Sequence, residues 1–198
     1  MKSLSLIFLL FGLFNASLLT SEPKPIRIDV NHSNIGFAVP IAGGLSKVRG
    51  KFSEFKMELN YDDKDITKST VDVKITVKSI DTGINQRDEH LRTADFFDVE
   101  KYPEITFKSK RVIKNGKKLT LVGDFTMHGV TKEISFPFTI TGRQFEEKEK
   151  LLTLGFLADL TINRRDFGIN YQHQSVPNFI GDLVEIELSI ITRANKIE

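Results

Sequence analysis

The sequence predicts a single antiparallel all-β domain. After about Pro25, most of the chain alternates apolar and polar residues with a period of two, which is typical of strands with one buried face. The chain has 198 residues, which is enough for one domain of ordinary size and few for two. One pair of alternating segments also fits the register of a two-residue hairpin.

Alternation identifies about eight or more strands along the chain. The clear segments contain Phe, Leu, Ile, Met and Val at every second position, while the weaker ones are shorter or less regular. The clear segments are 55–61, 71–77, 119–127, 134–140, 152–162 and 184–190, and the weaker ones are 26–39, 48–52 and 105–107.

Two turns allow the register to be tested by arithmetic. A two-residue turn at His128-Gly129 pairs residues whose numbers sum to 257, so Leu121 faces Phe136 and most apolar residues share one face. Lys132, opposite Phe125, is the exception. The same arithmetic at Asn115-Gly116 places an apolar residue beside a charge, so we expect a bulge at 109–111 or an odd-length loop.

Residues 86–98 break the strand pattern and predict a short helical insertion. Asn85 is the expected N-cap, followed by the acidic Asp88 in the first turn. Pro103 favours extended backbone at Tyr102 and marks the start of the next strand. The charged run at 146–150 is expected to be a solvated hairpin loop.

The N-terminus predicts export from the cytoplasm. Lys2 precedes the apolar run at 4–14, and small residues and prolines follow it. The run is shorter than the roughly 20 residues that cross a bilayer. We therefore predict a signal peptide at 1–21, a mature domain at 22–198, a periplasmic or secreted location, and no stable membrane insertion after signal removal.

Composition narrows the classes of partner and site. The formal net charge is +2 with 27% charged residues, so no strong field attracts nucleic acid, and we expect none as a partner. The chain has no cysteine, which excludes disulfides and thiolate ligands. Its four histidines are isolated in sequence, so we predict neither a metal nor a cofactor.

Catalytic patterns are weak. There is no GxSxG motif, and Asp88, Asp95 and Asp98 are expected to cap backbone or form ion pairs rather than act as acids and bases. Their expected partners are Arg87, Arg92, Arg164 and Arg165. We therefore predict no catalytic residues and a protein that is not an enzyme.

Three ordered motifs resemble the YceI-like polyisoprenoid-binding family, and the resemblance covers nearly the whole mature chain. The motifs are SIDTGINQRDEHLRTADFFDVEKYPEITFKS, GDFTMHGVTKEISFPF and NRRDFGIN. The sequence departs from the family pattern at Phe125, where leucine is usual, and in the loops after Asn60 and around Glu146.

The resemblance implies an extended, lipocalin-like antiparallel barrel of eight strands that encloses a polyisoprenoid or other long-chain lipid. The expected function is binding, transport or sequestration of that lipid outside the cytoplasm, and a homodimer is possible. The expected apolar lining is Phe37, Val39, Phe52, Phe55, Met57, Phe97, Phe107, Phe125, Met127, Phe136 and Phe156. The expected contacts to a lipid head group are His32, Arg87 and His90.

Two alternatives remain open from the residues alone. One is an enzyme acting on an isoprenoid or lipid head group through His90 with Asp88 or Asp95. The other is a secreted β interaction module without a ligand, because the same alternation arises when a barrel or sandwich is filled by its own side chains.

Overall fold

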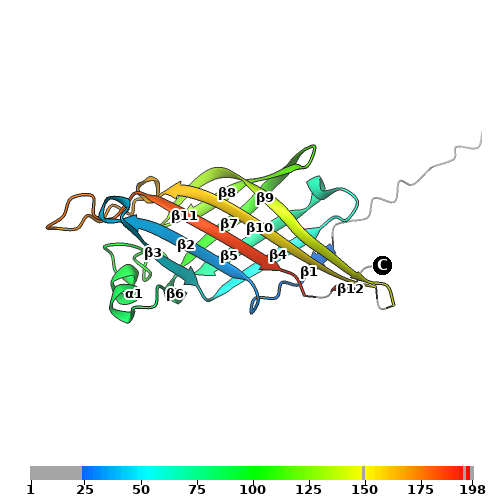
Figure 1. Ribbon diagram of the computed structural model, residues 1–198, viewed down its shortest axis with the longest axis horizontal. Helices are drawn as coiled ribbons and strands as arrows, with labels where there is room; N and C mark the ends of the chain where they lie inside the picture. The colour runs from blue at the N-terminus through cyan, green and yellow to red at the C-terminus, as the bar shows by residue number, and fades with distance from the viewer. Residues whose placement is uncertain (1–23, 149, 194, 197–198) are drawn as a thin grey trace, which may run out of the picture.

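The computed structural model describes residues 24–148, 150–193 and 195–196. Its strands form one antiparallel sheet that curls into an elongated half-barrel, with a single α-helix at one end (Figure 1). The predicted signal peptide at 1–21 lies outside the described residues. The mature-domain boundary at residue 22 also lies there and stays a prediction.

The strands differ greatly in length, and the longest form the wall of the half-barrel. They are β1 (Lys24–Ile26), β2 (Asn34–Ile41), β3 (Ser46–Phe52), β4 (Phe55–Tyr61), β5 (Thr70–Thr76), β6 (Ile80–Asp81), β7 (Glu104–Asn115), β8 (Lys118–Met127), β9 (Val130–Glu146), β10 (Leu151–Asn163), β11 (Leu183–Ile191) and β12 (Asn195–Lys196). The helices are α1 (Asn85–Arg92) and the short 3-10 segments η1 (Ala42–Gly44), η2 (Ile66–Lys68), η3 (Val77–Ser79) and η4 (Arg164–Phe167).

The predicted number of eight strands is wrong, whereas the predicted antiparallel, barrel-like all-β fold is confirmed. The described part of the chain has twelve strands, ordered β1-β4-β5-β7-β8-β9-β10-β11-β2-β3-β6, with β12 paired to β10. Within that part, no ladder joins the end strands β1 and β6. The predicted strand at 26–39 divides at a turn where His32 N donates to Asp29 O, and two- or three-residue strands at the edges leave no alternation to count.

The register predicted for the hairpin of β8 and β9 is confirmed. Leu121 pairs with Phe136, Phe125 with Lys132, and Met127 with Val130. His128 and Gly129 both have positive φ, as this turn requires. Lys132 fits opposite Phe125 because its Nζ lies 3.3 Å from Asp166 and 5.7 Å from the centre of the Phe167 ring.

The bulge predicted between Ser109 and Arg111 is also confirmed, but its hairpin turn lies elsewhere. Asn115 pairs with Lys118, so Gly116 and Lys117 form the turn instead of Asn115 and Gly116. The bulge changes the register by one residue and returns apolar side chains to the same face of the sheet.

Helix α1 is shorter than the predicted insertion at 86–98. It ends at Arg92, and turns follow up to about residue 101. Asn85 is the first helical residue rather than the N-cap, and the N-cap position belongs to Ile84, whose side chain makes no capping bond. The α1 end of the half-barrel also carries the turn between β2 and β3 and the loop before β11 (Figure 1).

The inward face of the sheet is apolar along its whole length. Buried side chains from nearly every long strand form one continuous cluster, which includes Ile35, Ile75, Phe107, Leu154 and Ile162. Within the described residues, no helix combines the length and apolar character required to cross a membrane.

Substitution of Gly123 tests how closely β7 and β8 approach each other beside the bulge. A Cβ at Gly123 would lie 2.5 Å from the carbonyl oxygen of Lys108 and equally close to the Phe107 ring. We expect Gly123→Ala to lower the free energy of unfolding by about 1–3 kcal/mol, because the backbone must move. Chemical denaturation measures this change.

The matched control is Gly142→Ala in β9, where no atom lies within 4 Å of the added Cβ. It should change stability by less than about 0.5 kcal/mol. Equal destabilisation by the two substitutions would contradict the close approach at Gly123.

Candidate functional site

An elongated apolar cavity of about 620 Å³ lies inside the curled sheet. Its wall comes from β2, β3, β4, β5, β7, β8, β9, β10 and β11, because each of these strands turns alternate side chains inward. It extends from α1 and the loop before β11 to η2 and the neighbouring end of β4. The interior of the curled sheet is therefore not filled by the protein's own side chains.

Most residues predicted to line the interior do line this cavity. They are Phe37, Val39, Phe52, Met57, Phe97, Phe107, Phe125, Met127, Phe136 and Phe156. Phe55 does not line it. Phe55 is half-buried at the first position of β4 and packs against the core, while Met57 and Leu59 on the same face reach the cavity. Contact of any of these residues with a ligand stays a prediction.

An aromatic cluster narrows the cavity at the α1 end. The ring of His90 packs edge-on against Phe96 and Tyr171, with centroids 5.1 Å and 5.2 Å away. Phe96 and Tyr171 also pack together at 4.6 Å. These contacts join the turn after α1 to the loop before β11, so two segments distant in sequence together narrow this end of the cavity.

Polar contacts hold α1 against β6 and the residues around it. Asp88 is buried and accepts hydrogen bonds from the backbone N and the hydroxyl of Thr82. Arg92 donates to the carbonyl oxygens of Lys78 and Ile80, both at 2.9 Å. The charge of the helix therefore serves mainly to attach it to the chain segment that precedes it.

Two of the three predicted head-group residues reach the cavity. Arg87 donates through Nε and Nη2 to the hydroxyl and carbonyl of Thr82, both at 2.7 Å, and its Nη1 makes no hydrogen bond to the described residues. His90 Nε2 lies 2.9 Å from Asp95 Oδ2, and the His90 side chain is partly exposed at the mouth. Both residues thus offer polar atoms to one end of an apolar cavity.

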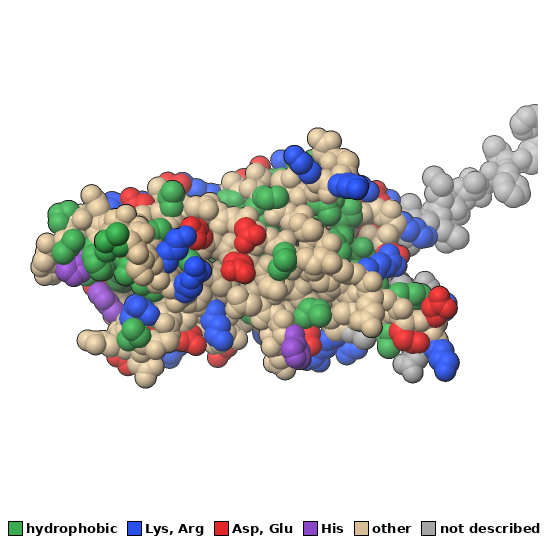
Figure 2. Space-filling view, in the orientation of Figure 1, with side chains coloured by type: hydrophobic (Ala, Val, Ile, Leu, Met, Phe, Trp, Pro, Cys, Tyr) green, Lys and Arg blue, Asp and Glu red, His purple; other side chains and the backbone are tan. Residues whose placement is uncertain are grey.

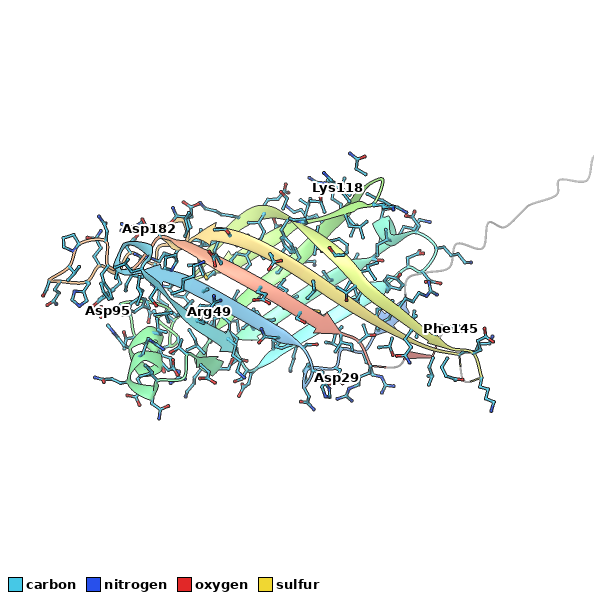
Figure 3. All side chains as sticks on the ribbon, in the orientation of Figure 1. Asp29, Arg49, Asp95, Lys118, Phe145 and Asp182 are labelled. Carbon is cyan, nitrogen blue, oxygen red and sulfur yellow. The ribbon has the colours of Figure 1, made fainter. Side chains whose placement is uncertain are left out.

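His32 does not line the cavity. It lies in the turn before β2, and its Nδ1 pairs with Asp29 Oδ2 at 2.8 Å. This hydrogen bond lowers the pKa of the Asp29 carboxyl. Figure 3 places Asp29 well away from Asp95 and Asp182, which mark the α1 end. The prediction of His32 beside the other two residues is not supported by this placement.

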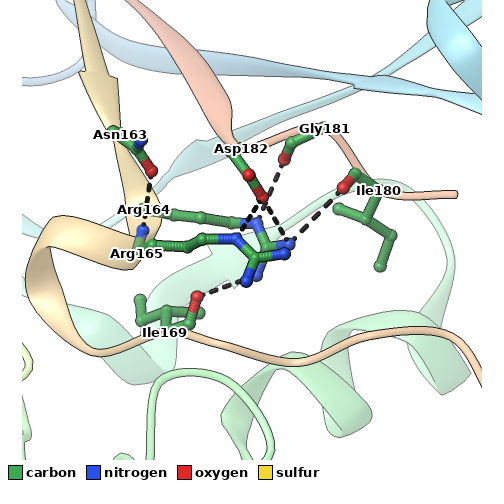
Figure 4. Close-up of polar contacts among 7 residues, drawn as sticks. All are labelled: Asn163, Arg164, Arg165, Ile169, Ile180, Gly181 and Asp182. Atoms are coloured by element: carbon green, nitrogen blue, oxygen red, sulfur yellow. Dashed lines mark hydrogen bonds and ion pairs between the residues drawn. The ribbon is translucent and has the colours of Figure 1, made fainter. Parts of the chain in front are cut away.

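A buried guanidinium lies at the same end of the cavity, and the sequence did not predict it there. Arg164 is 4% exposed and donates to the carbonyls of Ile169 at 2.7 Å, Gly181 at 3.1 Å and Ile180 at 3.4 Å (Figure 4). Its Nη2 also lies 3.0 Å from Asp182 Oδ1. Burial lowers the pKa of Arg164, and the Asp182 carboxylate opposes that shift. Arg164 therefore fixes both ends of the loop before β11.

The expected pairing of arginines with Asp88, Asp95 and Asp98 is wrong. Arg164 and Arg165 both pair with Asp182, Arg87 binds Thr82, and Arg92 binds carbonyl oxygens. These partners are distant in sequence or belong to the backbone, so charge complementarity did not identify them. One feature of the sequence could have indicated a buried arginine here: Arg164 and Arg165 directly follow the apolar strand β10.

The other end of the cavity has fewer polar groups. Tyr61, Ser69 and Thr70 line it there, next to η2. Burial raises the pKa of the Tyr61 hydroxyl, and nearby Asp63 adds to the rise. Tyr61 therefore remains a neutral hydrogen-bond donor near pH 7.

The described residues contain no cluster of three His, Asp or Glu side chains arranged to hold a metal ion. They contain one histidine and carboxylate pair at the cavity, His90 with Asp95, whereas Asp88 is already bonded to Thr82. The geometry therefore favours an apolar binding cavity with polar groups at its ends.

Comparison with known sequences agrees with the motifs and the fold. The sequence model of the YceI-like domain matches residues 27–192. This chain belongs to the YceI-like family. Among YceI-like proteins, Protein YceI of Escherichia coli O6:H1 (strain CFT073) is 34% identical over 166 residues, covering 81% of this chain and 86% of the relative.

Solved structures share this fold. BcnA of Burkholderia cenocepacia superposes with a TM-score of 0.74 at 21% identity, over 84% of this chain and 99% of that chain. A structure described as a polyisoprenoid binding domain from Saccharophagus degradans has a TM-score of 0.61 at 14% identity, over 85% and 97% of the two chains.

Arg164→Met tests the structural role of the buried guanidinium. The substitution keeps an apolar stem but leaves the carbonyls of Ile169, Ile180 and Gly181 without their donor. We expect the free energy of unfolding to fall by about 2–5 kcal/mol in chemical denaturation.

The control is Lys132→Met, which breaks an exposed pair with Asp166. An exposed pair contributes less than about 1 kcal/mol. If Arg164→Met lowered the free energy of unfolding no more than Lys132→Met does, Arg164 would not be the anchor of the loop before β11.

Proposed function

We propose that this protein binds a long apolar ligand, a polyisoprenoid or another long-chain lipid, and carries or sequesters it outside the cytoplasm. The observation that supports this most directly is the elongated cavity of about 620 Å³, whose middle is lined by aliphatic and aromatic side chains from nine strands. Its volume lies within the range of about 300–1,000 Å³ found for small-molecule sites.

The shape and chemistry of the cavity suit a flexible hydrocarbon chain. A ligand that buries about 400 Å² of its own hydrocarbon surface gains about 10 kcal/mol before the costs of ordering it. No catalytic group is needed for this binding. The polyisoprenoid-binding description of the structural relative from Saccharophagus degradans supports the same class of ligand.

The polar end of such a lipid would lie at the α1 end of the cavity. Arg87 Nη1 and the Tyr171 hydroxyl are donors there that make no hydrogen bond to other described residues. The His90 ring packs edge-on against both Tyr171 and Phe96 at the same end of the cavity. A hydroxyl or phosphate of the ligand can be satisfied at this mouth, whereas burying it deeper would leave it unpaired at high cost.

The location outside the cytoplasm is part of the proposal. It is supported by the basic residue and apolar run at the N-terminus, which have the form of a signal peptide. A carrier of hydrocarbon is useful in an aqueous compartment where the lipid alone would not dissolve.

Ala158→Phe tests the cavity. Ala158 is 8% exposed on β10 and lines the cavity, so a phenyl ring there occupies space that the ligand needs. We expect binding of a fluorescent prenyl alcohol to weaken about tenfold or more, because lost burial of a few methylene groups has this effect. Fluorescence titration measures the dissociation constant.

The matched control is Thr161→Phe, on the same strand but exposed on the outer face. It should leave prenyl binding within about twofold of the unmodified protein, since its ring points away from the cavity. Equal affinities for the Ala158→Phe and unmodified proteins, with both folded, would overturn cavity binding.

A further inference from the structure

Two loops at the α1 end expose aliphatic side chains to solvent. Leu45, in the turn between β2 and β3, is 90% exposed, and Val176, in the loop before β11, is 45% exposed. We name residues 40–46 and 171–181 together the two-loop tip. Two further exposed residues adjoin these elements: Ile84, at the N-cap position of α1, is 52% exposed, and Leu183, the first residue of β11, is 57% exposed.

Backbone hydrogen bonds make the two-loop tip one unit. Ala42 N donates to Phe179 O, and Gly181 N donates to Pro40 O, both at 2.8 Å. Arg164 then anchors the second loop through the carbonyls of Ile180 and Gly181. The exposed leucine and valine therefore project from a braced structure.

The tip lacks charge in a chain that is 27% charged. No Asp, Glu, Lys or Arg occurs at 33–46 or at 167–181. The space-filling view shows hydrophobic side chains gathered at this end, together with histidines (Figure 2). An uncharged, protruding tip that exposes the aliphatic side chains of Leu45 and Val176 can enter the interface of a bilayer without the cost of burying a charge.

The exposed apolar residues of the hairpin tips away from α1 have charged neighbours. Ile113 is 45% exposed, and Lys114, Lys117 and Lys118 follow it within five residues at the tip of the hairpin. Phe145 precedes the charged run at 146–150, and Lys150 Nζ lies 5.9 Å from the centre of its ring. Exposure of an aliphatic side chain alone therefore does not distinguish the two-loop tip, whereas its lack of charge does.

The tip is continuous with the cavity. Ile41, His173, Phe179 and Ile180 belong to the two loops and also line the cavity wall. An apolar path thus connects the exposed surface with the interior. A soluble protein partner would not need this connection, but a hydrocarbon chain leaving a bilayer would, because it avoids exposure to water along the way.

We propose that the two-loop tip docks on the surface of a lipid bilayer and that the apolar ligand passes between bilayer and cavity there. This inference deepens the proposed lipid binding and rests on it for the passage of ligand. The tail enters the cavity and the polar end stays near Arg87 and Tyr171 at the mouth. Because the tip has no charge, zwitterionic lipid is sufficient for docking.

The chain contains no tryptophan, so a single introduced one reports its local environment. We would place it at Gln174 in the tip, an exposed residue, and at Ile113 in the charged hairpin as the control. With phosphatidylcholine vesicles, Gln174→Trp should shift its emission to shorter wavelength and be quenched by lipids with brominated acyl chains. Ile113→Trp should show neither effect.

A second substitution tests whether the native aliphatic side chains cause the docking. Leu45→Ser in the Gln174→Trp protein should raise the lipid concentration for half-maximal shift about tenfold, since one large aliphatic side chain loses its burial. Ile113→Ser in the same protein should leave that concentration unchanged. Leu45 does not line the cavity, so Leu45→Ser should retain binding of the fluorescent prenyl alcohol.

The outcomes separate docking from ligand binding. Absence of the Gln174→Trp shift, or an equal shift at Ile113→Trp, overturns docking even if the prenyl alcohol binds. A shift that depends on protein concentration without vesicles identifies a self-association surface and also overturns the lipid assignment. A vesicle-dependent shift that survives Ala158→Phe supports docking even if cavity binding is lost.

Discussion

The structure depends on one constraint, the two-residue period of a β-strand, which places alternate side chains on opposite faces. Every long strand uses its inward positions for apolar residues, so a curled sheet gathers them around one interior. The large rings come from several strands and do not fill the space between them, which leaves the elongated cavity. The strands thus determine the chemistry of the cavity wall, and the loops determine its ends.

The α1 end shows how polar groups are accommodated beside an apolar cavity. Arg164 has its donors satisfied by three carbonyls and Asp182, and Asp88 is bonded to Thr82. Among the described residues, no buried side-chain nitrogen or oxygen lacks a hydrogen-bond partner. Because burying an unpaired polar group is costly, these bonds permit a helix and a loop to cover apolar surface without destabilising it. The remaining donors at the mouth are then available to a ligand.

Local patterns in the sequence predicted the strands well and the ends of the cavity poorly. The register of the hairpin at His128 and the bulge near Ser109 followed from turn residues and alternation, which are local properties. The order of the strands in the sheet and the pairing of Arg164 with Asp182 depend on contacts between distant segments. Phe55 shows the limit of alternation, since the period assigns a face but not whether a residue at a strand end reaches the cavity.

Native mass spectrometry of the protein isolated from its own source shows directly whether the cavity holds a long-chain lipid. We expect a stoichiometric adduct that organic extraction removes and that tandem analysis identifies as a prenyl or acyl lipid. A polypeptide that carries no adduct, and takes up none when incubated with polyprenols and phospholipids, would contradict lipid binding in the cavity.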